Sequence, residues 1–203
     1  RGLGDVYKRQ ILMNTEPSVI AKNISYKIND NKLFHDLSFC LNKGKALHIC
    51  GDNGSGKSTL IRIILGITKQ TKGELEISST KGISYLGHKN AIKNYLSVED
   101  NILLMQLHNH KDLNRYIEIL NLKKYLDVLV ANLSFGQQKK LALLRIFLNN
   151  SDIIILDEPF VGLDNETQKT LSNFLNEQLE NNKILIFTSH ISCEINSEAL
   201  NIS

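Results

Sequence analysis

The sequence lacks any apolar run approaching the roughly 20 residues that a membrane-spanning helix needs. Its best candidate, residues 141–148, is interrupted by Arg145. Cysteine is also scarce, because Cys40, Cys50 and Cys193 are odd in number and form no C-x-x-C pair. This usage excludes a disulfide scaffold and indicates a reducing compartment.

The sequence also lacks a large surplus of charge of either sign. The net charge is +3, and acidic and basic residues are mixed along the chain rather than gathered in a basic block. A basic stripe of the kind that binds a phosphate backbone is absent, so we expect no nucleic-acid partner. Repeats and low-complexity tracts are also missing, and 203 residues suffice for one domain with a sizeable core.

The first residues show no structural periodicity. Residues 1–10 contain no methionine and resemble a translated sequencing-adapter tail. We expect residues 1–12 to be a non-native or disordered leader, with the natural chain starting at Met13. The remainder, residues 13–203, is then expected to be a single domain.

Apolar runs bounded by turn residues alternate with helical patterns along the chain. Strands are expected at residues 18–28, 32–41, 45–50, 73–77, 82–86, 152–156 and 183–188. Helical patterns cover residues 58–65, 97–129, 135–148 and 166–179, with Ser97 as a helix cap. The alternation predicts an α/β fold with a mainly parallel core sheet, a small antiparallel sheet and an inserted helical subdomain at about 92–149.

A glycine-rich loop carries the strongest chemical signal. Residues 51–58 read Gly-Asp-Asn-Gly-Ser-Gly-Lys-Ser and fit the phosphate-binding pattern G-x-x-x-x-G-K-[ST]. They lie between an expected strand and an expected helix, which aims the helix N-terminus at a phosphate. Lys57 would reach the β- and γ-phosphates, and Ser58 would offer a hydroxyl to Mg²⁺. The candidate nucleotide-binding residues are Gly51, Asp52, Asn53, Gly54, Ser55, Gly56, Lys57, Ser58 and Thr59.

Two carboxylates follow the apolar strand at residues 153–156. Because ligands bind at the carboxyl ends of parallel strands, Asp157 and Glu158 are expected to face the phosphate loop. Asp157 would hold Mg²⁺ together with Ser58, and Glu158 would orient and polarise the attacking water. The alternative is that these two carboxylates form a solvated acidic turn. The strand and its two acids would favour that interpretation if the sequence had no phosphate loop.

A third motif, Ser134-Phe135-Gly136-Gln137, begins the expected helix at residues 135–148. Its hydroxyl, backbone amides and positive helix end suit a phosphate. The short string is common before helices. Its place between the glycine-rich loop and the carboxylate pair makes it specific.

Taken in order, these motifs resemble the nucleotide-binding subunits of ABC transporters, which are P-loop NTPases. Members of that family carry a phosphate loop, a signature like residues 133–137, an Asp-Glu-Pro like residues 157–159, a loop like residues 162–164 and a switch histidine like His190. The resemblance covers about residues 18–191 and implies an ATPase with ATP and Mg²⁺ as cofactors.

The resemblance also implies roles for individual residues. Two copies of the chain would pair head to tail as a homodimer, with the signature residues Ser134 and Gly136 serving the partner's nucleotide. His190 would contact the γ-phosphate during catalysis, and Tyr26 would stack on adenine. Structural packing is the alternative for His190 and Tyr26.

Within the family, residues 85–88 (Tyr-Leu-Gly-His) and 91–93 (Ala-Ile-Lys) are similar to a stretch of the ATPases of cytochrome c maturation, the haem exporter ATP-binding subunits. That resemblance implies a peripheral subunit on the cytoplasmic face of the bacterial inner membrane. The implied partners are an integral membrane permease subunit of the CcmB type and haem-handling membrane proteins. We expect no haem ligand in this chain, and we interpret His108 and His110 as a solvated helix end.

Two positions depart from the family pattern. Lys89 stands where members carry a glutamine that contacts Mg²⁺ or water, and Phe135 is bulky where the signature has a small residue. We expect Phe135 to be tolerated. The alternatives are another small ABC transporter, a soluble ABC ATPase of DNA repair or translation, and a nucleotide-binding scaffold that does not turn over, which Lys89 would favour.

Overall fold

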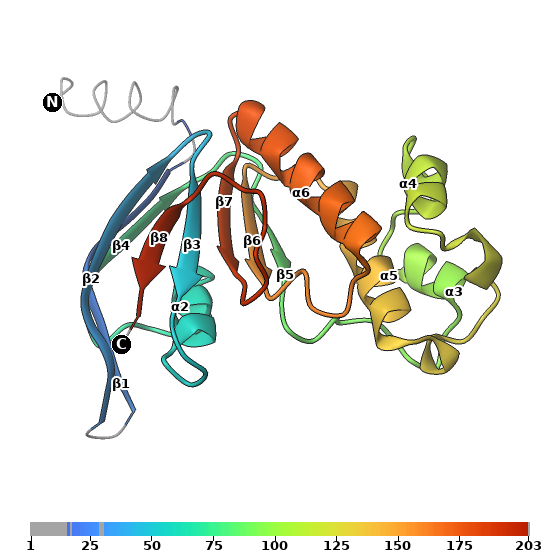
Figure 1. Cartoon of the computed structure of the whole chain (residues 1–203). Coiled ribbons are helices and arrows are strands. Elements are labelled where there is room, and N and C mark those ends of the chain that lie inside the picture. The colour runs from blue at the N-terminus through green and yellow to red at the C-terminus, as the bar shows by residue number, and fades with distance from the viewer. Residues whose placement is uncertain (1–15, 17, 29–30, 203) are drawn as a thin grey trace, which may run out of the picture.

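The computed structural model describes residue 16 and residues 18–28 and 31–202, which form two sheets and a set of helices (Figure 1). The expected leader at residues 1–12 and the expected start at Met13 lie outside the described residues. The predicted fold class is confirmed: a parallel core sheet is accompanied by a small antiparallel sheet.

The antiparallel sheet has three strands in the order β2-β1-β4. They are β1 (Ser18–Ile28), β2 (Asn31–Asn42) and β4 (Lys72–Ser78). β1 pairs with β2 on one side and with β4 on the other. The register shifts after Ala21, where the positive φ of Asn23 (49°) interrupts the regular pairing.

The parallel sheet has five strands in the order β5-β6-β7-β3-β8. They are β3 (Ala46–Cys50), β5 (Ile83–Leu86), β6 (Ile153–Asp157), β7 (Ile184–Thr188) and β8 (Glu198–Asn201). All residues of β6 and β7 are buried, as expected for strands covered on both faces. The carboxyl ends of all these strands therefore meet at one edge.

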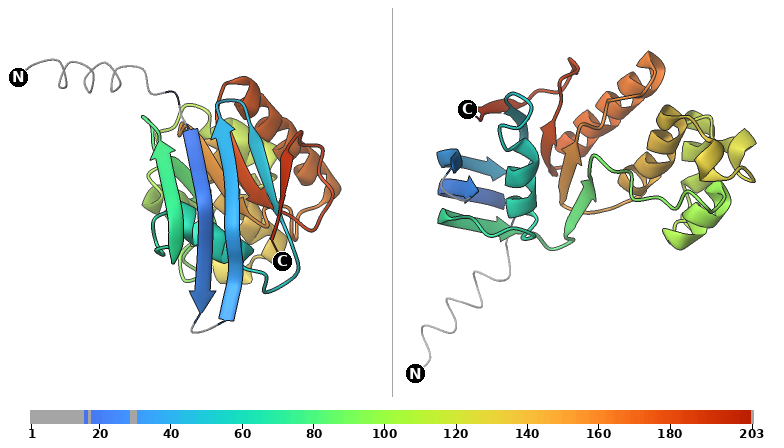
Figure 2. Two further views of the ribbon diagram at one scale, coloured as in Figure 1. Left: turned by 90° about the vertical axis from the view of Figure 1, so that its left-hand side faces the viewer. Right: turned by 90° about the horizontal axis from the view of Figure 1, so that it is seen from below.

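Helices cover both faces of the parallel sheet. α2 (Lys57–Ile64) lies between the two sheets (Figure 2), where Leu60, Ile61, Ile63 and Ile64 are buried. α6 (Asn165–Glu180) covers the opposite face with Leu171, Phe174 and Leu175. Successive residues of β6 and β7 alternate between these two cores, so the sheet holds both layers of helices.

The stretch at residues 97–129, where the sequence predicts a helical pattern, is divided into short helices and turns. It contains α3 (Val98–Leu104), α4 (Leu113–Ile119) and the 3₁₀ turn Lys123–Tyr125, and a second 3₁₀ turn follows at Val130–Asn132. Positive φ values at Gln106 (59°) and Asn121 (55°) follow α3 and α4 directly, so each helix stops there. The predicted cap is confirmed, because Ser97 forms a capping box with Asp100.

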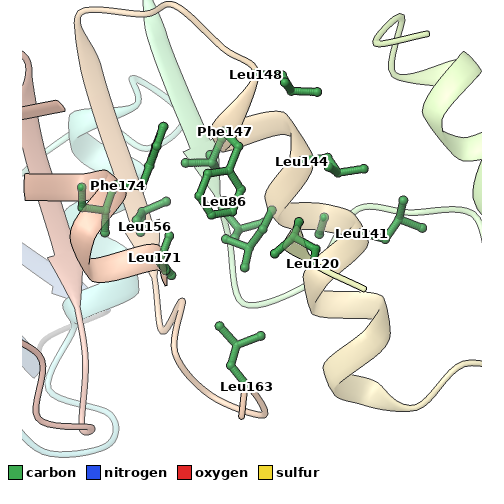
Figure 3. Packing of buried hydrophobic residues seen from close by; sticks show 14 of the residues in the cluster. Leu86, Leu120, Leu141, Leu144, Phe147, Leu148, Leu156, Leu163, Leu171 and Phe174 are labelled. Atoms are coloured by element: carbon green, nitrogen blue, oxygen red, sulfur yellow. The ribbon is translucent and has the colours of Figure 1, made fainter. Parts of the chain in front are cut away.

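α5 (Phe135–Phe147) connects these helices to the parallel sheet. Its Leu141, Leu144 and Phe147 pack in one core with side chains of β5, β6 and α6 (Figure 3). Phe147 and Phe174 of α6 meet edge to face, with ring centroids 4.6 Å apart. This packing holds the end of α5 against the middle of α6.

Candidate nucleotide-binding site

The phosphate loop runs from the end of β3 to the start of α2. Gly56 is the N-cap of α2, with a φ of 107°. A Cβ there would lie 2.8 Å from the Leu33 side chain and 2.9 Å from that of Phe34. Glycine is therefore required twice over, by its backbone angle and by the approach of β2.

Lys57 draws this loop together. Its ammonium donates to the carbonyl oxygens of Gly51 (2.7 Å) and Asp52 (2.9 Å). The positive charge therefore sits within the turn of the loop, beside the N-terminus of α2. A cation and a helix N-terminus placed together favour a bound anion.

Asp157, at the end of β6, is joined to two elements by its carboxylate. The hydroxyl of Ser58 in α2 donates to its Oδ2 (2.9 Å), and the hydroxyl of Thr188 in β7 donates to its Oδ1 (2.8 Å). Only 5% of Asp157 is exposed. A hydroxyl and a carboxylate in contact at the edge of a cavity are the oxygen donors that Mg²⁺ prefers, so these residues fit that ion.

Glu158 has an unusual backbone conformation for a non-glycine residue, with a φ of 51°. Its N–H donates to the hydroxyl of Thr188 (2.9 Å), which holds that conformation in place. Its Oε2 accepts from the backbone N–H of His190 (3.2 Å), and its Oε1 lies 3.5 Å from His190 Nε2. Oε1 is buried without a hydrogen-bond partner among the described residues. A strained, positioned carboxylate of this kind is typical of a functional site.

These groups line one cavity of about 450 Å³. It brings together the glycine-rich loop, the carboxylates of β6, His190, and hydrophobic side chains of the β1–β2 hairpin. Its lining residues are Ile28, Leu33, Asn53, Gly54, Gly56, Lys57, Ser58, Thr59, His88, Asp157, Glu158, Val161 and His190.

Several residues that the sequence singled out lie outside the lining of this cavity: Gly51, Asp52 and Ser55 of the glycine-rich loop, Tyr26, and Lys89. The ring of Tyr26 packs against that of Phe34, with centroids 6.2 Å apart, and Ile28 lines the cavity instead. Lys89 is exposed and lies outside the lining, although its neighbour His88 belongs to it. Adenine stacking on Tyr26 stays a prediction that this geometry does not favour.

The signature lies in a different place from the phosphate loop. Ser134 caps α5 in a capping box with Gln137, and both residues line a second cavity of about 490 Å³ with Phe135 and Gly136. In Figure 1 the start of α5 and the loop before α2 are separated by β5–β7, at the same edge of the sheet. Within one chain the two motifs therefore do not share a cavity.

The signature is fastened to the loop before α6. A Cβ on Gly136 would lie 2.4 Å from the carbonyl oxygen of Gly162, and a Cβ on Gly162 would lie 2.4 Å from the ring of Phe135. Lys140 of α5 pairs with Asp164, the N-cap of α6, at 2.6 Å. Phe135 is accommodated because Gly162 has no side chain, and half of it (50%) stays exposed.

The Lys140–Asp164 pair makes a testable contribution to stability. The hydrogen bond from Lys140, with those from Thr167, holds the pKa of Asp164 well below its usual range. In D164N the amide still caps α6 but the charge is lost. We expect the wild type to be more stable by under about 1 kcal/mol, because the carboxylate is half exposed.

The pH dependence follows from the lowered pKa. The stability difference between wild type and D164N is fully present above the unfolded-state pKa of about 3.9 and shrinks as the pH falls through the folded-state value. Urea unfolding from pH 7 to pH 2.5 measures it. A difference that is equal across this range would contradict the assignment.

Two further groups near the site were missed by sequence reasoning. His48 of β3 stacks on Phe187 of β7 (centroids 4.6 Å apart), and its Nε2 lies 3.1 Å from the carbonyl oxygen of Ser189. Lys139 of α5 is 1% exposed, so burial lowers the pKa of its ammonium while the charges of Asp157 and Glu158 oppose that shift. The sequence gives neither residue a role at the site, because their surroundings come from distant elements.

Residues 34–161 match the family described as ABC transporter. The chain belongs to the ABC transporter family. It is 32% identical over 181 residues to the "Cytochrome c biogenesis ATP-binding export protein CcmA" of Brucella abortus (strain 2308), covering 84% of each chain. It is 30% identical over 203 residues to the CcmA of Nitrosococcus oceani, covering 94% of each.

The fold comparison agrees with this assignment. The solved structure of the ATP-binding subunit of an ABC transporter superposes with a TM-score of 0.75 at 23% identity, covering 87% of this chain and 80% of that one. The protein is thus an ATP-binding, ATP-hydrolysing ABC subunit, of a family whose members dimerise and pair with membrane permeases. Among the residues that the structure describes, no helix is both long and apolar enough to cross a membrane.

Proposed function

We propose that this ABC subunit drives a membrane complex for c-type cytochrome biogenesis, either by haem export or by release of a haem chaperone. The observation that carries the proposal is the extent of the likeness. Relatives named for cytochrome c biogenesis align with this chain over as much as 94% of both lengths. The similarity therefore extends well beyond the nucleotide motifs that every ABC subunit shares.

In this proposal the ATP phosphates lie in the loop of residues 51–58, against Lys57 and the start of α2. Ser58 and Asp157 would hold Mg²⁺, which supplies positive charge for the phosphate oxygens when bound. The hydroxyl oxygen of Ser58 and Oδ2 of Asp157 are 2.9 Å apart. Thr188 orients the second carboxylate oxygen of Asp157 through its 2.8 Å hydrogen bond.

Glu158 is the general base of this proposal. Its Oε1 is buried, lacks a hydrogen-bond partner within the described part of the chain, and belongs to a residue that lines the cavity. It can accept a hydrogen bond from a water poised to attack the γ-phosphate. His190, whose Nε2 is 3.5 Å away, would hold the γ-phosphate and keep Glu158 aligned with it.

The separation of the signature from the phosphate loop supports a composite site. Ser134 and Gly136 line a cavity of their own on the same sheet edge. In a head-to-tail homodimer, the signature of one chain would close the partner's nucleotide cavity. ATP then joins the two chains, and hydrolysis releases them.

The permease partner would dock on the helical region. In the helical region of this chain, about residues 92–149, exposed apolar side chains include those of Tyr95, Leu103, Leu104 and Leu129. Between 47% and 73% of each of these four is exposed. Apolar side chains that stay in contact with water favour a protein interface. We assign this surface to a CcmB-type permease, with haem-handling membrane proteins beyond it. The complex would place this subunit peripherally on the cytoplasmic face of the inner membrane.

Complementation tests this function. A bacterial host deleted for its own cytochrome c maturation ATPase receives this chain with the membrane protein encoded beside it. Haem staining of c-type cytochromes should reappear with the wild type and not with E158Q. A stable, membrane-assembled wild-type complex that restores no cytochrome would contradict the proposal and favour another small ABC transporter.

The docking surface has a matched control. The double variant L103D/L104D should lose co-purification with the permease and retain ATP binding, because the substituted side chains lie outside the nucleotide cavity. Ile67 is equally apolar and 68% exposed, and it lies outside the helical region. I67D should co-purify normally. Equal behaviour of the two variants would remove the docking assignment.

A further inference from the structure

The geometry points to His88 as a further nucleotide-contact residue, one that donates a hydrogen bond to the terminal phosphate from the side opposite His190. This inference rests on the proposed ATP site and adds a residue to it. His88 ends the stretch of residues 85–88 that carries the family resemblance, but the sequence assigns it no contact with nucleotide. Its assignment comes from the arrangement of three neighbouring strands and from the lining of one cavity.

Strand register places His88 beside the catalytic carboxylate. β5 and β6 are parallel, with Leu86 opposite Leu156. His88 follows Leu86 by two residues, and Glu158 follows Leu156 by two residues, so the two lie at equivalent positions beyond neighbouring strands. On the other side of β6, Asp157 pairs with Thr188 of β7, and His190 follows two residues later. Because the strand order is β5-β6-β7, the two histidines flank the carboxylates from opposite sides.

The segment that carries His88 is held on both sides. Before it, Leu86 is fully buried in the core. After it, the carbonyl oxygen of Asn90 accepts a 2.7 Å hydrogen bond from Arg145 of α5, and Asn90 is 9% exposed. Gly87 lies against the phenol of Tyr85, which a Cβ would approach to 2.5 Å. His88 itself is exposed and lies between these two held positions.

The chemistry of the cavity suits a donor at this point. Lys57 and the start of α2 face the phosphates from one end, and His190 lies beside Glu158. An imidazole N–H at His88 would add a charge-assisted hydrogen bond to the outermost phosphate oxygens. Lys89 would not make this contact, because it lies outside the cavity lining. In this chain His88, and not Lys89 at the position of the family's glutamine, would thus supply the polar contact with the terminal phosphate.

A contact with the terminal phosphate distinguishes ATP from ADP. The full chain is titrated with Mg²⁺ and a non-hydrolysable ATP analogue, and separately with Mg-ADP, using fluorescent nucleotides. In H88A the analogue should bind about 10-fold more weakly or worse, with unchanged ADP affinity, because a hydrogen bond to a charged group is lost. H88Q keeps a donor and should recover part of the loss. K89A is the matched neighbour and should bind both nucleotides normally.

A second readout follows the side chain directly. In protein labelled with ¹⁵N-histidine, the ring resonances assigned to His88 through H88A should shift with the ATP analogue and not with ADP. Equal losses for both nucleotides, or unshifted resonances, would overturn the inference while leaving the ATP site intact. A wild type that binds neither nucleotide would instead overturn the proposed function.

Discussion

E158Q should hydrolyse ATP at least 100-fold more slowly than the wild type and bind it with unchanged affinity. The amide keeps the size of the carboxylate, and its carbonyl oxygen still accepts from the His190 backbone N–H, now 3.2 Å from Oε2. It cannot accept a proton from the attacking water. A positioned general base contributes about 10²–10⁴ in rate. Phosphate release under saturating Mg-ATP measures the effect.

E166Q is the matched control for this prediction. Glu166 is an exposed carboxylate in the first turn of α6 and lies outside the cavity lining. Its replacement should leave hydrolysis within about twofold of wild type, because surface substitutions away from a site have small effects. If E158Q and E166Q hydrolysed ATP equally fast, Glu158 would not be the base.

G136A should lower hydrolysis by about 100-fold although it adds a single methyl group. The new Cβ would stand 2.4 Å from the carbonyl oxygen of Gly162, so the signature turn and the loop before α6 must separate. A displacement of about 1 Å at a positioned group costs on the order of 10² in rate. Overpacking should also lower the free energy of unfolding by about 1–3 kcal/mol.

F135A tests whether the size of the side chain beside the Gly136–Gly162 contact affects hydrolysis. The ring of Phe135 lies next to Gly162 and is 50% exposed, so its removal adds no close contact of the kind that G136A creates. We expect F135A to keep hydrolysis within a few-fold of wild type. Urea unfolding and phosphate release should be measured for both variants. Full activity in G136A would show that the signature tolerates displacement.

Much of the fold was predictable because local signals were strong. β6 and β7 are continuous apolar runs, and the glycine-rich loop lies between β3 and α2 as expected. β8 was not predicted, since its residues Glu198–Asn201 are mostly exposed and have no apolar pattern. The breaks after α3 and α4 were also missed, because Gln106 and Asn121 adopt positive φ without a glycine to mark them.

Some residues of the site were likewise predictable from the sequence, and others were not. Sequence motifs predicted the phosphate loop, Asp157, Glu158 and His190, and the structure brings these three residues and most of the loop to one cavity. The role of His88 depends on the pairing of β5 with β6, which the sequence does not specify. Adenine stacking on Tyr26 stays a prediction, because the pairing of Tyr26 with Phe34 across β1 and β2, which places the two rings 6.2 Å apart, is equally invisible in the sequence.

ATP should join two copies of this chain, each completing the other's nucleotide site. Light scattering on E158Q with Mg-ATP measures the mass of the assembly. We expect a mass of about 46 kDa, twice the 22.9 kDa of one chain, and a return to about 23 kDa when S134R is added. If E158Q binds Mg-ATP and remains at the mass of one chain, the two copies do not share their nucleotide sites.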